Sequence, residues 1–468
     1  MSALVFESFL STPEVIAVFS ETAFVQAMMD FEAALARAQA AEGVIPASAA
    51  QAIGGVCKAE LFDVPAIVAA SGRAGSLAIP LVKKLTETVA LFDADAAGYV
   101  HWGSTSQDVI DTAMLLVTRR ALALIDRDLG SLIASLQSLA RTHGDAPMLA
   151  RTLMQPAQVV SFGFKLVGWI APLLRSQQRL RAAGQAALQL QLGGAVGTLA
   201  VMGEAGPAVA QRVAASLQLA LPPLAWHTQR DEVVSLACEV GVLTGTLGKI
   251  ARDISLLAQG EVAELAEPSG GGRGGSSAMP HKRNPVAAMI ALAAALRVPH
   301  RVSALLAAMV QEHERGLGNW QAELAESAGL YVSAHGALKA LADAALALEV
   351  DAPRMRRNID ALQGLVFAEA VAMRFASRIG KARAHALLER LSRVAVASGR
   401  HLREVTLQAL VDDEALRGSV DAAELAALFE PATAAQRAIA IARPQLDALT
   451  ERAHALAQQP PWAAWLPT

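Results

Sequence analysis

Aromatic residues and cysteines are scarce in this 468-residue chain. Only 4% of the residues are aromatic, although 53% are hydrophobic. Strands favour aromatic and β-branched side chains, whereas alanine and leucine favour helices, so the composition predicts long packed helices rather than sheets. The two cysteines, Cys57 and Cys238, exclude a disulfide framework and fit a reducing cytosol. A net charge of −3 gives no electrostatic reason to expect a nucleic-acid partner.

A long, purely apolar run of the kind that spans a bilayer is also missing. The segment from Ala182 to Gly203 lacks charge but contains glutamines and several glycines, and the run from Val286 to Leu296 is too short. The N-terminus has no basic region ahead of an apolar core, which a secretory signal requires. We therefore expect a cytoplasmic protein with no membrane partner.

The motifs of several common enzyme classes are absent as well. Lys282 follows Pro-His rather than glycine, so the glycine-rich stretch before it is not a phosphate-binding P-loop. The chain has no His-Glu-x-x-His, no zinc-type Cys/His spacing, no Gly-x-Ser-x-Gly, and no Gly-x-Gly-x-x-Gly after a predicted strand. We expect no metal and no organic cofactor.

Helical periodicity dominates what is present, and it predicts an all-α fold built on a central bundle of long helices. The expected helices cover residues 108–145, 157–190, 231–264, the segment after Pro285, and 322–348. The sequence Asp351-Ala352-Pro353 marks a boundary, so we predict three domains, at residues 1–107, 108–352 and 353–468. Apolar residues on more than one face of these helices favour an oligomer core over a monomer.

The segment from Gly270 to Pro285 is the most informative stretch of the chain. It reads Gly-Gly-Gly-Arg-Gly-Gly-Ser-Ser-Ala-Met-Pro-His-Lys-Arg-Asn-Pro. Its glycines predict a mobile loop that presents the hydroxyl of Ser276 and the cation of Lys282. Asn284 followed by Pro285 is typical of a helix N-cap and the first helical residue. A hydroxyl, a cation and a helix N-terminus side by side suit an anionic substrate and a proton transfer.

Further polar segments stand at predicted helix boundaries. Ser104, Thr105 and Ser106 precede a helix with Asp108 in its first turn. Helix capping explains one hydroxyl and the aspartate, whereas a carboxylate-binding site explains all three hydroxyls, and both interpretations stay open. Considered singly, the other segments are more consistent with structural roles; they are Arg151–Pro156, His227–Asp231 and His313–Trp320.

Together these segments resemble a known family. Residues Gly275 to Pro285 are similar to the signature of the fumarase/aspartase superfamily, and Thr105-Ser106 and Arg151-Thr152 follow the order of its other regions. The resemblance covers nearly the whole chain. It implies a three-domain helical subunit in a homotetramer, built on a twenty-helix bundle, with each active site made from three subunits. It also implies bond cleavage next to a carboxylate, through a dianion that cations and donors stabilise.

One departure from the superfamily narrows the chemistry. Adenylosuccinate lyases and fumarases carry a histidine after the Arg-Thr pair, where this chain has Leu153. In the lyases that use it, that histidine protonates the leaving amine, which leucine cannot do. A carboxylate leaving group needs no proton, because its conjugate acid has a pKa of roughly 4. The chain accordingly resembles the bacterial 3-carboxy-cis,cis-muconate cycloisomerases of protocatechuate degradation, in which a substrate carboxylate closes a lactone.

The resemblance implies a role for each residue of the candidate site. Ser276 would carry the proton, and Lys282 with the helix start at Asn284 would neutralise the enediolate. Two alternatives stay open: a C–N lyase like adenylosuccinate lyase, and a catalytically silent helical scaffold. The small tricarboxylate substrate would also contact His101, Ser104, Thr105, Ser106, Arg151, Thr152, Gln155, Asn284 and Arg315.

Overall fold

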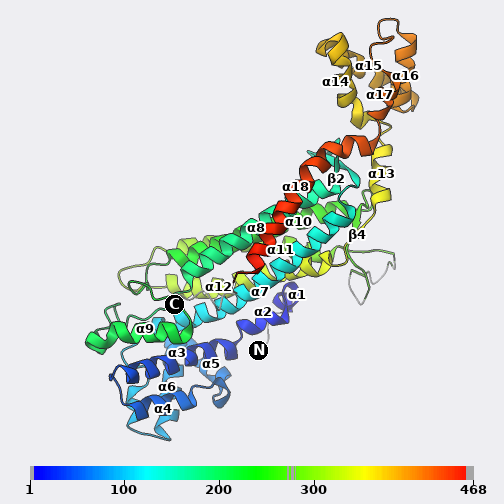
Figure 1. Cartoon of the computed structure of the whole chain (residues 1–468). Helices are drawn as coiled ribbons and strands as arrows, with labels where there is room; N and C mark the ends of the chain where they lie inside the picture. The colour runs from blue at the N-terminus through cyan, green and yellow to red at the C-terminus, as the bar shows by residue number, and fades with distance from the viewer. Residues whose placement is uncertain (1–4, 271–273, 276–278, 280, 460–468) are drawn as a thin grey trace.

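Five long helices form the centre of the molecule (Figure 1). The computed structural model describes residues 5–270, 274–275, 279 and 281–459. Helix α11 packs against α10 and α12, and α7 packs against α8 and α12, so the five helices form one bundle. This confirms the all-α fold class. The bundle helices are α7 (Ser106–His143), α8 (Phe162–Ala187), α10 (Asp231–Leu257), α11 (Val286–Ala308) and α12 (Asn319–Ala345).

One predicted helix begins later than expected. The start of the predicted helix 157–190 belongs instead to a β-hairpin of β1 (Pro147–Thr152) and β2 (Gln155–Ser161). Helix α8 begins only at Phe162, where Ser161 Oγ accepts a hydrogen bond of 3.2 Å from a backbone N–H in the first turn. The predicted start was therefore wrong by about one and a half turns, because a capping serine ends the strand.

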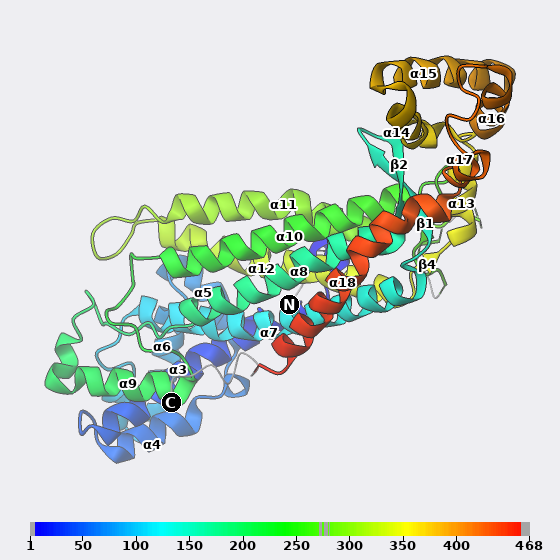
Figure 2. The same cartoon turned by 45° about the horizontal axis from the view of Figure 1, so that its top comes forward.

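Shorter elements flank the bundle at both ends (Figures 1 and 2). The N-terminal helices are α1 (Val5–Leu10), α2 (Pro13–Val18), α3 (Glu21–Ala41), α4 (Ala47–Val56), α5 (Val64–Ala74) and α6 (Ala78–Ala90), and α9 (Gly206–Leu217) lies beside them. Strands β3 (Leu265–Ala266) and β4 (Glu349–Val350) pair at the opposite end of the bundle. The C-terminal helices are α13 (Ala352–Asp360), α14 (Ala368–Ile379), α15 (Lys381–Ser398), α16 (Leu402–Asp412), α17 (Ala422–Ala427) and α18 (Pro431–Ala457).

Two hydrophobic cores stabilise the chain. The larger core joins the bundle to the N-terminal helices and contains Phe31, Leu122 and Trp169. The smaller core lies among the C-terminal helices and contains Val371 and Phe375. Helix α18 starts in the smaller core and then runs back along α8 (Figure 1). The division into three domains at residues 107 and 352 stays a prediction.

Two bundle helices, α10 and α11, are long and apolar enough to cross a membrane by length and composition alone. Half of the apolar window of α10 is buried inside the chain. In α11 only 22% of that window is buried. Met289, Leu296 and Leu306 are among its exposed side chains. The single chain therefore leaves an apolar helix face uncovered.

Candidate active site

The three predicted hydroxyl residues lie at the N-terminal end of α7. Thr105 is the N-cap residue and Ser106 is the first helical residue. Asp108 Oδ2 accepts hydrogen bonds from the Thr105 backbone N–H at 3.1 Å and from Ser104 Oγ at 3.4 Å. Capping therefore explains the aspartate, as one of the two interpretations expects. The Ser106 hydroxyl has no hydrogen-bond partner among the described residues.

Arg315 reaches the same place from a position 210 residues further along the chain. It lies on the loop between α11 and α12, and its Nη1 donates a hydrogen bond to Thr105 Oγ1. The structure thus brings together two segments that the sequence analysis assigned to one site. Whether Arg315 also binds substrate stays a prediction.

His101 lies beside these hydroxyls and is paired with a buried glutamate. Its Nδ1 is 2.5 Å from Oε1 of Glu32, which lies on α3 and is 1% exposed. Burial lowers the pKa of His101. The charge of Glu32, its hydrogen bond and the charge of Asp108 outweigh burial, so the pKa of His101 lies above its ordinary value. The pair therefore favours an imidazolium next to the hydroxyl segment.

Asp108 is the centre of a buried network that no local sequence pattern reveals. Its Oδ1 accepts hydrogen bonds from His227 Nε2 at 2.7 Å and from the Gly193 N–H at 3.1 Å. Its Oδ2 accepts another from the Gly194 N–H at 2.9 Å. Gly194 has φ 71°, and a Cβ there would lie 2.9 Å from the carbonyl oxygen of Gly103. The start of α7 is thereby fixed against a loop that only glycine can form.

A second buried network lies one turn further along α7. Arg230 donates to Asp111 at 2.7 and 3.1 Å and to Glu323 at 2.9 Å, and all three residues are at most 3% exposed. Trp320 Nε1 donates to Asp111 Oδ1 at 2.9 Å. Burial lowers the pKa of Arg230, but the two carboxylates raise it by more. The polar residues at 227–231 and 313–320 thus include structural supports for this end of the bundle.

Thr152 and Gln155 lie at the opposite end of the bundle, on either side of the turn between β1 and β2. The turn residues are Leu153, with φ 49°, and Met154, with φ 69°. Positive φ at both central positions is typical of a type I′ hairpin, which strongly favours Asn-Gly over large side chains. Leu153 is 97% exposed and Met154 is 68% exposed. Two large apolar side chains therefore stand out from the chain on an unfavourable backbone.

Arg151, on the same hairpin, already has a partner within the chain. Its Nη2 lies 2.9 Å from Oε1 of Glu264, whose side chain is fully buried. Asn358 Nδ2 donates to the same carboxylate oxygen at 2.8 Å. The predicted contact of Arg151 with a substrate carboxylate would therefore have to share the guanidinium with Glu264, and it stays a prediction.

The predicted proton carrier, Ser276, lies outside the described residues. Lys282 and Asn284, from the same segment, are described, and the Lys282 side chain is exposed. Both line a surface cavity of about 720 Å³, together with Glu267 and Glu349. The structure thus places Lys282 and Asn284 together, beside acidic side chains and at the end of the bundle that carries β4.

The predicted cap of α11 is wrong by one residue. The helix begins at Val286, its N-cap residue is Pro285, and Asn284 does not cap it. Instead Glu267 accepts hydrogen bonds from the N–H groups of Ala287 and Ala288, at 2.8 and 2.9 Å. A carboxylate is favourable there because the helix dipole is positive at this end. These two N–H groups at the helix start are thus occupied within the chain. Of the two groups expected to neutralise the enediolate, the helix start and Lys282, Lys282 remains.

The two groups of candidate residues lie far apart in one chain. Helix α7 has 38 residues, which corresponds to about 57 Å at 1.5 Å per residue. Thr105 stands at its start, and β1 follows its end. Figures 1 and 2 show β2 and β4 at one end of the bundle and α3, α4 and α6 at the other. A single chain therefore cannot bring Thr105 and Lys282 to one small substrate.

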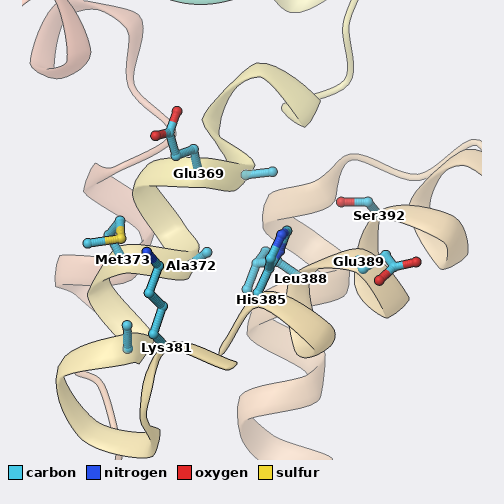
Figure 3. Close-up of a pocket in the computed structure, with 10 residues that line it drawn as sticks. Glu369, Ala372, Met373, Lys381, His385, Leu388, Glu389 and Ser392 are labelled. Carbon is cyan, nitrogen blue, oxygen red and sulfur yellow. The ribbon is translucent and has the colours of Figure 1, made fainter. Parts of the chain in front are cut away.

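A separate groove of about 510 Å³ lies between α14 and α15 (Figure 3). Lys381, His385 and Glu389 border it, and its floor is formed partly by Met373 and Leu388. None of the residues predicted for the site lines this groove. It is therefore not a candidate for the active site.

Comparison with known proteins accounts for most of the chain. Residues 9–300 match the lyase family and residues 364–443 match the adenylosuccinate lyase C-terminus. The 3-carboxy-cis,cis-muconate cycloisomerase of Bradyrhizobium diazoefficiens is 50% identical over 90% of this chain and 93% of its own. The chain belongs to this cycloisomerase branch of the fumarase/aspartase superfamily. The family resemblance is thereby confirmed.

The cycloisomerase family also provides close structural neighbours. The crystal structure of the 3-carboxy-cis,cis-muconate lactonizing enzyme from Pseudomonas putida matches with a TM-score of 0.90 and 43% identity. The match covers 97% of this chain and all of that one. A nitrosuccinate lyase from Streptomyces davaonensis is 43% identical over 89% of this chain and 88% of its own. The chain is therefore also similar to a protein that is named for a lyase activity.

Proposed function

We propose that this protein converts 3-carboxy-cis,cis-muconate to 4-carboxymuconolactone. The observation that carries the proposal is Leu153, an apolar side chain where amine-releasing members of the superfamily have a proton donor. Lactone formation needs no donor there, because the oxygen that attacks, and that leaves in the reverse direction, belongs to a carboxylate. The names of the relatives support the same substrate.

In the proposed mechanism, a carboxylate oxygen of the substrate adds to a carbon of the conjugated diene and forms the C–O bond of the lactone. The electron pair of the alkene moves onto the neighbouring carboxylate as an enediolate, which Lys282 stabilises electrostatically. Ser276 then gives its hydroxyl proton to the α-carbon and regains a proton from solvent. General acid–base help of this kind contributes roughly 10² to 10⁴ in rate.

The proton balance of this reaction is specific. The substrate carries three carboxylates, which are ionised at neutral pH, and the product carries two carboxylates and an ester. Each turnover therefore takes up one proton from solution. Elimination of nitrite from nitrosuccinate would instead release a proton. The two reactions therefore change the number of free protons in opposite directions.

We also infer a cytoplasmic homotetramer in which each active site combines residues from different copies. Two observations support an assembly of several copies. The candidate residues lie at opposite ends of a helix of about 57 Å, and α11 leaves an apolar face uncovered. Packing α11 against other copies would cover that face and place the hairpin of one chain beside the α7 start of another.

The proposed activity is tested by mixing the purified protein with 3-carboxy-cis,cis-muconate and following the loss of diene absorbance. Adenylosuccinate is assayed in parallel. We expect loss of the diene and no turnover of adenylosuccinate. Turnover of adenylosuccinate without loss of the diene would overturn the proposal.

A second candidate function is nitrosuccinate cleavage, because Leu153 excludes amine leaving groups but not nitrite, which also departs without a proton. The nitrosuccinate lyase relative motivates the comparison. Nitrosuccinate has two carboxylates, whereas the cycloisomerase substrate has three. We expect kcat/KM to be higher for 3-carboxy-cis,cis-muconate than for nitrosuccinate, and the reverse order would favour the second candidate.

A further inference from the structure

Glu32 is a buried carboxylate to which the proposed reaction gives no role. It lies on α3, it is 1% exposed, and its Oε1 lies 2.5 Å from His101 Nδ1. Its Oε2 is buried without a hydrogen-bond partner among the described residues. Among the described residues, His101 is the one ion-pair partner of Glu32. A buried carboxylate with so few partners is costly unless the partner is a cation, so this environment favours protonated His101.

The position of the imidazole leaves one nitrogen for a ligand. Nδ1 faces Glu32, so Nε2 is the ring nitrogen that can contact another molecule. The N–H of Ser104 donates to the His101 carbonyl at 3.3 Å, which closes a turn and keeps the ring beside the hydroxyl segment. Gln39, two turns along α3 from Glu32, donates from Nε2 to the Trp102 carbonyl at 2.7 Å. Helix α3 thus holds this segment at two points.

We propose that Glu32 is a positioning residue that keeps His101 protonated and oriented, so that Nε2–H binds a carboxylate of the substrate. The proposal rests on the proposed function, because it assigns His101 to a tricarboxylate ligand. It adds a residue from α3 that no motif of the site contains. The carboxylate–imidazole pair supplies both a fixed ring orientation and a positive charge.

The charges around His101 set the direction of its pH dependence. Glu32 from α3 and Asp108 from α7 both favour the imidazolium, and burial opposes them. His227 lies behind Asp108, and Arg315 lies on Thr105 from the α11–α12 loop. Because the pKa of His101 lies above its ordinary value, the imidazolium persists to a higher pH than that of an ordinary histidine and is lost as the pH rises through that pKa. Substrate binding through His101 should therefore weaken on the alkaline side.

The first test compares kcat and KM across pH for the wild type and Glu32→Gln, which preserves shape and removes the charge. An opposite charge at this distance shifts a pKa by about 1–3 units. We expect the pH at which KM rises to move down by at least about one unit in Glu32→Gln, so that KM is about tenfold higher than in the wild type at pH values above both transitions, with kcat little changed. The rise of KM at high pH is called the alkaline limb of KM. An alkaline limb at the same pH in Glu32→Gln and the wild type would overturn the proposal.

Two further variants distinguish the effect of the Glu32 charge from the effect of anchoring the segment that carries His101. Gln39→Asn weakens the neighbouring anchor of the same segment without changing charge, and it should leave the alkaline limb of KM in place. Glu32→Asp retains the charge and should retain the wild-type limb. A shift as large in Gln39→Asn as in Glu32→Gln would show that loss of support, not charge, is responsible.

The second test does not depend on turnover. Protein labelled with ¹³C at histidine Cε1 is titrated by NMR, and the resonance that His101→Gln removes is assigned to His101. We expect a lower titration midpoint in Glu32→Gln than in the wild type, and equal midpoints would overturn the proposal. Failure of the wild type to consume 3-carboxy-cis,cis-muconate would overturn the proposed function alone, and this titration would still test the Glu32–His101 pair.

Discussion

At the scale of single residues, Leu153 combines three features that are unfavourable in an isolated chain. It is large and apolar, it is 97% exposed, and its φ is 49°. Strained, exposed residues of this kind cluster at functional sites. In the proposed assembly, Leu153 lies beside the substrate in a site that another copy completes. There its side chain excludes water and cannot donate a proton to a leaving group.

Replacing Leu153 with alanine should therefore affect activity more than folding. The side chain is nearly fully exposed, so the free energy of unfolding should change by less than about 0.5 kcal/mol. Loss of an apolar contact of about 1.5–3 kcal/mol beside the substrate should lower kcat/KM by about tenfold or more. Leu91→Ala, at a side chain that is 80% exposed, is the matched control and should leave kcat/KM unchanged. Equal kcat/KM in wild type and Leu153→Ala would contradict this role.

At the scale of elements, sequence periodicity predicted the long helices well, because apolar residues recur on one face over many turns. It failed at residues 157–161, where five residues carry too little pattern to separate a strand from a helix start. The site motifs could be recognised in the sequence because each is a short continuous segment. Their supporting contacts were not, because Glu32 contacts His101 across 69 residues of sequence and His227 contacts Asp108 across 119. Such contacts have no local signal.

The buried network beneath α7 should be a strong structural element. Arg230→Met leaves two buried carboxylates, Asp111 and Glu323, without their cation, and should cost about 3–5 kcal/mol of unfolding free energy. Arg356→Met is the matched control, because Arg356 pairs with Asp360 at 2.9 Å on the exposed surface of α13. It should cost less than about 1 kcal/mol. Urea unfolding measures both, and similar small losses would contradict the role of the buried network.

The packing of α7 on α12 should be sensitive to acid. Burial raises the pKa of Asp128, but hydrogen bonds and charges from His335 and Arg127 lower it to about 2. Because this folded-state pKa lies below the ordinary value of about 3.9, the stabilisation is present above about pH 4 and is lost as pH falls towards 2. Asp128→Asn should therefore cost about 2 kcal/mol near pH 6 and much less near pH 2.5, as measured by urea unfolding. A loss independent of pH would contradict the ionic account.

At the scale of the whole molecule, the length of α7 separates the two groups of candidate site residues. In one chain, Thr105 and Lys282 lie at opposite ends of the bundle, and α11 leaves apolar side chains exposed. Assembly with other copies addresses both facts. Sequence motifs alone do not state how far apart their residues lie, so this requirement emerges only from the fold.

Complementation between inactive variants tests the shared site. Thr105→Ala and Lys282→Ala, whose residues lie at opposite ends of the bundle, should each lower kcat strongly, by roughly 10² or more for the lysine. Dissociating and reassembling a mixture of the two should restore part of the activity, because some mixed sites carry both wild-type halves. A mixture that stays as inactive as its components would contradict a site built from different copies.

Lactone formation from a tricarboxylate consumes a proton, so proton uptake is a direct test of the proposed activity. The purified protein is mixed with 3-carboxy-cis,cis-muconate in weakly buffered solution near pH 7, and proton uptake and product are measured together. We expect one proton to be consumed for each molecule of 4-carboxymuconolactone formed. No conversion of this substrate, or conversion without proton uptake, would contradict it.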